Sequence, residues 1–275
     1  MRSLGTLGGS QSRARGINDR TEVVGFSEIH PGSPVTRAFL WSETAGMRSL
    51  GTLGGESSAA NAVNNRREVV GRSDIRNGNG RAFLWTAGHG MRNLGTLGGK
   101  NSIAIDLNDA TQVVGSSETS DGSEHAFLWT PGRGMEDLGT LGGAASIAWG
   151  ISEAGAIVGS SETAGGRSVA FLWTRERGMR SLGTLPGLPE SFAARVNTHL
   201  RVVGVGFSDT AGQPFLWTPG GGMQPLPTLG GGGRAEELNE FGQIVGVSTK
   251  KNGEDRATLW TPSVGPLTVM EENPR

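Results

Sequence analysis

The chain has 275 residues, a formal net charge of −1, 47 glycines, and no cysteine or tyrosine. The near-neutral charge excludes the basic surface with which proteins bind nucleic acid or anionic membranes. The absence of cysteine excludes disulfides and thiolate chemistry. No apolar run is long enough to cross a bilayer, so membrane insertion is not expected. The length is sufficient for one domain with a large core.

The first residues, 1–9, are already a copy of a motif that recurs along the chain. A secretory signal would instead show a basic segment, an apolar stretch and a cleavage site. If the chain is complete as given, the sequence therefore predicts a cytoplasmic protein.

A Phe-Leu-Trp segment recurs with a fixed period. Its sixth copy is altered to Thr258-Leu259-Trp260. Successive tryptophan numbers differ by 44, 44, 44, 44 and 43, the six residues being Trp41, Trp85, Trp129, Trp173, Trp217 and Trp260. A period in the forties is typical of propellers, solenoids and other repeat arrays.

Each repeat contains four short segments with the composition of β-strands. In the third repeat they are 102–108, 112–117, 126–129 and 135–141. Val, Ile, Phe, Trp and Thr are enriched in such segments, and Gly, Asn and Pro stand at their borders. Asp121-Gly122 has the composition of a hairpin tip. Four strands joined by hairpins form an antiparallel sheet that must stack on neighbouring copies to be stable.

Six such units predict an all-β, six-bladed β-propeller of four-stranded antiparallel blades, forming a single domain over residues 1–275. Each repeated tryptophan is expected between blades, where burial of the ring contributes roughly 4–6 kcal/mol. A parallel β-helix is the alternative, but its coils are usually shorter and lack hairpin tips.

The ends of the chain predict how the ring closes. After Trp260 the expected Met-x-x-Leu segment is replaced by 266–269, which begins with a proline that cannot donate to a sheet. Residues 1–7 are a complete copy of that segment. We therefore expect residues 1–7 to form the outer strand of the last blade and the tail, 262–275, to lie over it.

The repeat unit resembles a known family. The shared motifs are Leu-Gly-Thr-Leu-Gly-Gly, Ser-x-Ala-x-x-Ile-Asn, Val-Val-Gly-x-Ser and His-Ala-Phe-Leu-Trp, the last standing at 125–129. Together they resemble the HAF repeat of bacterial proteins usually described as probable extracellular repeat proteins. The resemblance implies a propeller-like, often secreted protein, and it implies no catalytic residues.

Function is expected where the copies differ. The Ser-x-Ala-x-x-Ile-Asn segment is predicted to line the central channel, and its positions one, three and four residues after the Ser vary. From these positions we predict a ligand site with an apolar wall and a few charges. Its residues are Arg13, Arg15, Asn61, Asp106, Trp149, Phe192, Arg195 and Arg234. The alternative is that these side chains fill the channel or pair as surface ions.

Three functional hypotheses follow. The first is a non-catalytic binding or interaction propeller whose ligand is a glycan, peptide, protein or small molecule at the channel mouth. The alternative is an enzyme of hydrolase, lyase or cyclase type with one asymmetric site near Trp149. There Glu236 or Glu237 would act as general base and an arginine as anion clamp, with His199 as a further acid/base candidate. A structural or assembly role through the outer strands is a third hypothesis, although the sequence carries no interface signal that sets an oligomeric state.

Metal and cofactor sites are not expected. The four histidines fall at different phases of the repeat, without the spacing of metal ligands: His30, His89, His125 and His199. The segment 74–80 superficially resembles a calcium loop but lacks the terminal Glu, so a hairpin tip is expected there. The repeated Asn, as at Asn64, is expected to stabilise its own turn, with ligand binding once per blade as the alternative.

Overall fold

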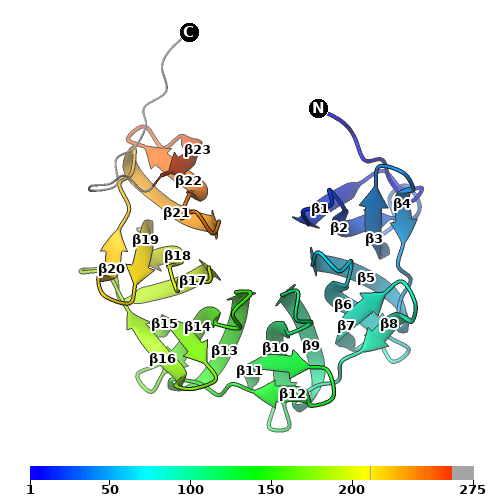
Figure 1. Cartoon of the computed structure of the whole chain (residues 1–275), viewed down its shortest axis with the longest axis horizontal. Coiled ribbons are helices and arrows are strands. Elements are labelled where there is room, and N and C mark those ends of the chain that lie inside the picture. The colour runs from blue at the N-terminus through cyan, green and yellow to red at the C-terminus, as the bar shows by residue number, and fades with distance from the viewer. Residues whose placement is uncertain (211, 262–275) are drawn as a thin grey trace. The chain divides into compact units, whose positions relative to one another are not determined.

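A computed structural model describes residues 1–210 and 212–261, so the expected position of the tail lies outside the described residues. The chain divides into two compact units, Met1–Leu138 and Gly139–Arg275. Within the described residues the secondary structure consists of strands and turns, with no helix. Each unit contains three repeats, and each repeat forms one antiparallel sheet (Figure 1).

The first unit contains the first three repeats. The first repeat consists of β1 (Ser12–Ile17), β2 (Val23–Glu28), β3 (Thr36–Ser42) and β4 (Gly46–Ser49). The second consists of β5 (Gly54–Val63), β6 (Val69–Ile75), β7 (Gly80–Thr86) and β8 (Gly90–Asn93). The third consists of β9 (Gly98–Leu107), β10 (Val113–Thr119), β11 (Glu124–Thr130) and β12 (Gly134–Asp137).

The second unit contains the other three repeats. The fourth repeat consists of β13 (Gly142–Ile151), β14 (Ile157–Thr163), β15 (Ser168–Thr174) and β16 (Gly178–Gly183). The fifth consists of β17 (Glu190–Val196), β18 (Val202–Phe207), β19 (Gly212–Thr218) and β20 (Gly222–Pro225). The sixth consists of β21 (Gly230–Leu238), β22 (Ile244–Lys250) and β23 (Asp255–Trp260), so its sheet has three strands among the described residues.

The strands of each sheet follow chain order, as expected for a series of hairpins. In the third repeat Val113 lies opposite Trp129 and Gly115 lies opposite Phe127. The expectation of antiparallel, four-stranded sheets is confirmed for the first five repeats, and the hairpin tip expected at 74–80 joins β6 to β7.

The Met-x-x-Leu-Gly-Thr-Leu segment is not one strand, which corrects the expectation from sequence. In the second repeat β8 ends at Asn93, and Gly95 has a φ of 88°, a left-handed conformation that turns the chain out of the sheet. The Leu97 N–H then donates to Ser117 Oγ of the next sheet at 2.9 Å. The segment is therefore divided between two repeats, because its last residues already belong to the next sheet.

The glycine of the Val-Val-Gly motif is required by the close approach of two strands. A Cβ atom on Gly115 would overlap the carbonyl oxygen of Ile103 on the neighbouring strand β9. The same overlap with the preceding strand would arise at the matching glycines Gly25, Gly71, Gly159, Gly204 and Gly246. Only glycine lets the second strand lie this close to the first.

The core lies between consecutive sheets. In the first unit Trp129 and Phe127 of the third repeat pack with Val70 and Leu84 of the second. In the second unit Trp260 packs with Val203 of the fifth repeat. The expectation that repeated tryptophans lie between sheets is confirmed within each unit. The most deeply buried rings include Phe83, Phe127, Phe171, Phe215 and Trp260.

A buried serine joins the first sheet to the second, the second to the third, and the fourth to the fifth. Ser102 Oγ of the third repeat accepts the N–H of Ala82 from the second at 2.9 Å and donates to the Gly95 carbonyl at 2.6 Å. Ser58 and Ser191 make the equivalent bonds in their repeats. The repeated serine is therefore a structural bridge.

The repeated asparagine stabilises its turn. Asn64 Oδ1 accepts the N–H groups of Arg66 and Glu68, and Asn64 Nδ2 donates to the carbonyl of Asn108 in the next repeat. Asn64 is buried, and the matching Asn108 and Asn197 are buried as well. The structure thus supports the turn-stabilising interpretation over a ligand contact in each repeat.

Residues 1–7 form no strand, but they pack on the first sheet. Leu4 and Leu7 lie against the Trp41 cluster, and the Leu7 N–H donates to Ser27 Oγ at 2.9 Å. The Arg2 guanidinium lies 5.2 Å from the centre of the Trp41 ring, which matches Arg92 over Trp129 in the third repeat. The segment makes the contacts that the end of a preceding repeat makes elsewhere, and its role as a closing strand stays a prediction.

Candidate functional site

Every first strand carries a β-bulge at the same position. In β13 the pairing passes from Ala148 opposite Gly159 to Gly150 opposite Val158, which leaves Trp149 between them. Bulges redirect side chains and are over-represented beside active sites. The residues at this position are Arg15, Asn61, Ile105, Trp149, Ala194 and Glu236. The bulge therefore coincides with one of the variable positions identified in the sequence.

Three first strands of the second unit bring a group of predicted site residues together. The rings of Trp149 in β13 and Phe192 in β17 lie edge to face, with centroids 5.2 Å apart and planes at 61°. Arg195 Nη1 donates to the Trp149 carbonyl at 3.0 Å. Arg195 Nη2 lies 2.9 Å from Glu237 Oε1 in β21. We call Trp149, Phe192, Arg195 and Glu237 the aromatic–arginine cluster.

The aromatic–arginine cluster combines an apolar wall with charged groups that solvent reaches. The side chains of Arg195 and Glu237 are 34% and 55% exposed, so both can meet a ligand without leaving each other. The Trp149 Nε1 atom is buried and has no hydrogen-bond partner among the described residues. Buried N–H groups without a hydrogen-bond partner are uncommon in proteins. The Trp149 indole therefore differs from a ring that is buried only to fill the core.

The other candidates of the second unit lie outside the cluster. Arg234 and Glu236 pair with each other along β21 at 2.6 Å. His199 is an exposed turn residue whose Nδ1 lies 3.7 Å from the Glu240 carboxylate. Glu237 also borders a pocket of about 250 Å³ formed with Leu238, Asn239, Gln243, Val245 and Leu259.

In the first unit, Arg15 and Asn61 form a chain of hydrogen bonds across three sheets. Arg15 Nη1 donates to Asn61 Oδ1 at 2.6 Å, and Asn61 Nδ2 donates to the carbonyl of Ala104 at 2.7 Å. The Arg15 guanidinium also lies 4.7 Å from the centre of the Phe26 ring. Burial, followed by repulsion from Arg13, lowers the pKa of Arg15. Its contacts hold neighbouring sheets together, which favours a structural role for this pair.

Arg13 and Asp106 complete the predicted set. Arg13 borders an open pocket of about 520 Å³ together with Phe26, Gln11 and Ser12. Asp106 Oδ1 accepts the N–H of Leu107 at 2.9 Å, a bond within its own strand. Of the predicted site residues, Trp149, Phe192 and Arg195 therefore lie together, with Glu237 beside them. Arg15 and Asn61 contact each other in the first unit.

Sequence reasoning missed a second variable position. The residue after Val-Val-Gly, or after Ile-Val-Gly in the fourth and sixth repeats, is Phe26, Arg72, Ser116, Ser160, Val205 or Val247 in the successive repeats. Phe26 borders the 520 Å³ pocket, and Arg72 and Ser116 border another pocket of about 440 Å³ in the first unit. Variation among otherwise similar copies was the signal that could have identified this position.

Among residues 1–210 and 212–261, no group of three or more His, Asp or Glu side chains is placed to hold a metal ion. Over the same described ranges, no helix has the length and apolar character that crossing a membrane requires.

Comparison with known proteins gives the fold alone. No protein-family model and no curated protein sequence matches the chain. Among solved structures, TolB from Acinetobacter baumannii is 14% identical with a TM-score of 0.56, over 81% of this chain and 55% of TolB. A puromycin hydrolase is 14% identical with a TM-score of 0.59, over 94% of this chain and 44% of the hydrolase. The BP39L lectin from Burkholderia pseudomallei is 9% identical with a TM-score of 0.48, over 93% of this chain and 82% of the lectin.

The chain therefore spans about half the length of TolB and of the puromycin hydrolase. At these identities the likeness concerns architecture only. The chain is an all-β protein of antiparallel sheets that is similar to propeller-like structures.

Proposed function

We propose that this chain is a non-catalytic ligand-binding propeller whose principal site is the aromatic–arginine cluster. The observation that carries the proposal is the convergence of Trp149, Phe192, Arg195 and Glu237 from three consecutive first strands. Trp149 is the bulged residue of its strand, and Arg195 and Glu237 each directly follow the bulged residue of theirs. Bulges redirect side chains and are over-represented beside active sites.

The chemistry of the cluster favours a neutral ligand with an apolar face. The two rings offer a surface for that face, while the guanidinium donates and the carboxylate accepts hydrogen bonds. Because Arg195 and Glu237 already neutralise each other, a ligand with a strong net charge would gain little. Glycans and short uncharged peptides have this chemistry.

The enzyme alternative has less support. Glu237 is paired with Arg195 and Glu236 is paired with Arg234, so both carboxylates are engaged by guanidinium groups. His199 is exposed in a turn and lies beside Glu240. A general base needs a position facing the reacting proton, and these contacts do not create one.

The proposal includes a closed, six-bladed ring, which the six repeats and the motif copy at residues 1–7 predict, and the HAF-repeat resemblance implies a propeller-like fold. Its support is the edge of the sixth sheet, where β23 has a strand on one side only among the described residues. Val245 and Leu259 of that sheet are 46% and 48% exposed, whereas the matching Val203 in the fifth repeat is buried by its neighbour. Residues 1–3 match the β-strand that follows Trp129 in the third repeat and would supply the missing strand.

The test is a binding screen of the purified chain against an array of glycans and of short peptides, followed by calorimetry on each hit. We expect Trp149→Ala and Arg195→Ala each to weaken binding at least about tenfold. The first variant removes the aromatic ring that contacts the ligand's apolar face, and the second removes a charged hydrogen-bond donor. Ile105→Ala changes the same bulge position in the third repeat and should leave affinity unchanged.

Unchanged affinity in both cluster variants would overturn the proposed site. Conversion of a bound compound to product, abolished by Glu237→Gln, would replace the binding function with the enzyme alternative.

A further inference from the structure

A second pocket lies between the second and third repeats, within the first unit. It has a volume of about 440 Å³, which is in the range of small-molecule sites. It is bordered by Arg72 of β6 and by residues of the next sheet and its β10–β11 hairpin. These are Asn101, Ser102, Ile103, Ser116, Glu118, Gly122 and Glu124.

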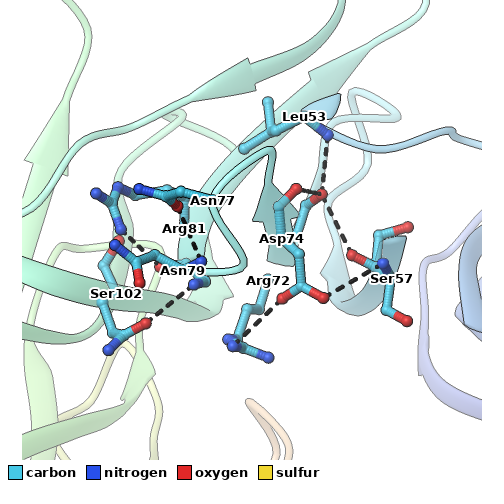
Figure 2. Close-up of polar contacts among 12 residues, drawn as sticks. Leu53, Ser57, Arg72, Asp74, Asn77, Asn79, Arg81 and Ser102 are labelled. Carbon is cyan, nitrogen blue, oxygen red and sulfur yellow. Dashed lines mark hydrogen bonds and ion pairs between the residues drawn. The ribbon is translucent and has the colours of Figure 1, made fainter. Parts of the chain in front are cut away.

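Arg72 is held in place by features that the other repeats do not combine. Its Nη2 lies 3.3 Å from Asp74 Oδ1 on the same strand, and Figure 2 shows the two side chains directed toward each other. A Cβ atom on Gly80 would overlap the guanidinium of Arg72. The space is left because the second repeat has glycine where the first and third have Thr36 and Glu124. The position of the Arg72 guanidinium therefore depends on the absence of a side chain at Gly80.

The opposite side of the pocket is equally well ordered. The Gly80 N–H donates to Asn101 Oδ1 at 2.9 Å, which joins the two sheets. Asn101 Nδ2 donates to Glu118 Oε1 at 2.7 Å, and the Lys100 and Asn101 N–H groups donate to Glu118 Oε2. The Asn101 side chain is the main cause that lowers the pKa of Glu118, so this carboxylate is ionised at neutral pH. These three hydrogen bonds hold the Glu118 carboxylate in one orientation, in which it can accept further hydrogen bonds from a ligand.

Glu124 supplies a second carboxylate. Its Oε1 accepts the hydroxyl proton of the buried Ser116 at 2.6 Å, which orients the group. Ile103 adds an apolar surface, and Ser102 is committed to the bridge between the sheets. The pocket thus presents the guanidinium of Arg72 as a hydrogen-bond donor, the carboxylates of Glu118 and Glu124 as acceptors, and the apolar side chain of Ile103.

We infer that this pocket is a second ligand site, distinct from the aromatic–arginine cluster, for a neutral polyhydroxylated molecule such as a single sugar ring. A sugar hydroxyl both donates and accepts, so neighbouring hydroxyls can bind the Arg72 guanidinium and a carboxylate at once. Asp74 offsets the charge of Arg72, and three N–H donors stabilise Glu118. Glu118 and Glu124 add two further carboxylates to the pocket, so an anionic ligand is disfavoured relative to a neutral one.

The experiment is ligand-observed NMR and calorimetry with D-glucose, D-galactose, D-mannose and L-fucose, together with glucosamine and glucuronate as charged analogues. We expect at least one neutral sugar to bind the unmodified chain. Arg72→Ser should weaken it at least about tenfold, because a charged hydrogen-bond donor is lost. The third repeat already has Ser116 at that position, so the variant is expected to fold. Gly80→Ala should weaken binding as well, because it displaces the guanidinium.

Ser160→Ala changes the matching position in the fourth repeat and is the control, which should leave the affinity unchanged. Sugar binding that Arg72→Ser leaves intact and Trp149→Ala abolishes would belong to the aromatic–arginine cluster and would overturn this inference. Failure of all four neutral sugars to bind would overturn the inference. Equal affinity in Arg72→Ser and the unmodified chain, or tighter binding of a charged analogue, would overturn it too.

Discussion

Arg195 Nη2 lies 2.9 Å from Glu237 Oε1 and thereby joins the first strands of the fifth and sixth repeats. Both side chains remain partly exposed, at 34% and 55%. Exposed ion pairs usually contribute less than about 1 kcal/mol to folding. The pair is therefore better suited to recognition than to holding the sheets together.

The first prediction separates these two roles. Glu237→Gln should lower the free energy of unfolding by less than about 1 kcal/mol in urea denaturation, because solvent already screens the pair. The same variant should weaken binding to a hit from the array. Glu236→Gln, on the same strand but paired with Arg234, is the control and should leave binding intact. A loss of stability well beyond this range would identify the pair as structural.

The second prediction concerns the close approach of strands β9 and β10. Gly115→Ala places a methyl group onto the carbonyl oxygen of Ile103, and we expect a loss of about 3 kcal/mol or more in unfolding free energy. Gly88→Ala is the control, because a Cβ atom there meets no atom within 4 Å. Calorimetric melts of both variants check the difference; similar melting temperatures would contradict the steric argument.

The third prediction concerns the serine bridge. Ser102→Ala removes the acceptor of the Ala82 N–H and the donor to the Gly95 carbonyl, both in a buried setting. Leaving such groups unpaired costs about 1–3 kcal/mol. The exposed Ser120→Ala should be neutral within error. If chemical denaturation gave the same stability for both variants, the bridge would not contribute.

The fourth prediction is a pH dependence. The Asn101 side chain, followed by the Lys100 N–H, lowers the pKa of Glu118 below its ordinary value of 4.5. A lowered carboxyl pKa contributes stability that is present above the ordinary pKa and is lost as pH falls through the folded value. Glu118→Gln should therefore melt below the unmodified chain at neutral pH, and the gap should shrink as the pH falls below 4.5. A gap that is constant with pH would show that the charge is not involved.

The fifth prediction tests closure of the ring. The register of β11 with β12 pairs Leu128 with Glu136, and the matching pair at the chain ends is Leu259 with Arg2. Because the chain has no cysteine, Arg2→Cys combined with Leu259→Cys should give a disulfide within one chain on oxidation.

Mass spectrometry and non-reducing gels would detect that disulfide. Arg2→Cys with Glu254→Cys, at the β22–β23 hairpin, is the control and should not form an intramolecular disulfide. Absence of the Leu259–Arg2 crosslink, or crosslinking only between chains, would contradict closure by the N-terminal segment.

The sequence by itself determined the parts of this protein that depend on local pattern. The 44-residue period, the strand segments, the hairpin tip at Asp121-Gly122 and the placement of Trp129 between sheets all follow from composition and spacing. The strand segments and the hairpin tip are encoded within single repeats, where turn chemistry and apolar content decide the outcome. The burial of Trp129 follows because a lone four-stranded sheet must stack on its neighbours to be stable.

Only the tertiary structure decided which side chains from different repeats meet. The bulge at Trp149, the division of the Met-x-x-Leu segment after Asn93 and the space that Gly80 leaves for Arg72 each depend on two strands approaching. A single sequence lists the variable residues but not their neighbours across sheets. The candidate sites are formed by residues from neighbouring sheets. The sequence did not predict them because contacts between repeats, unlike strand formation, are set by how separate sheets pack against one another.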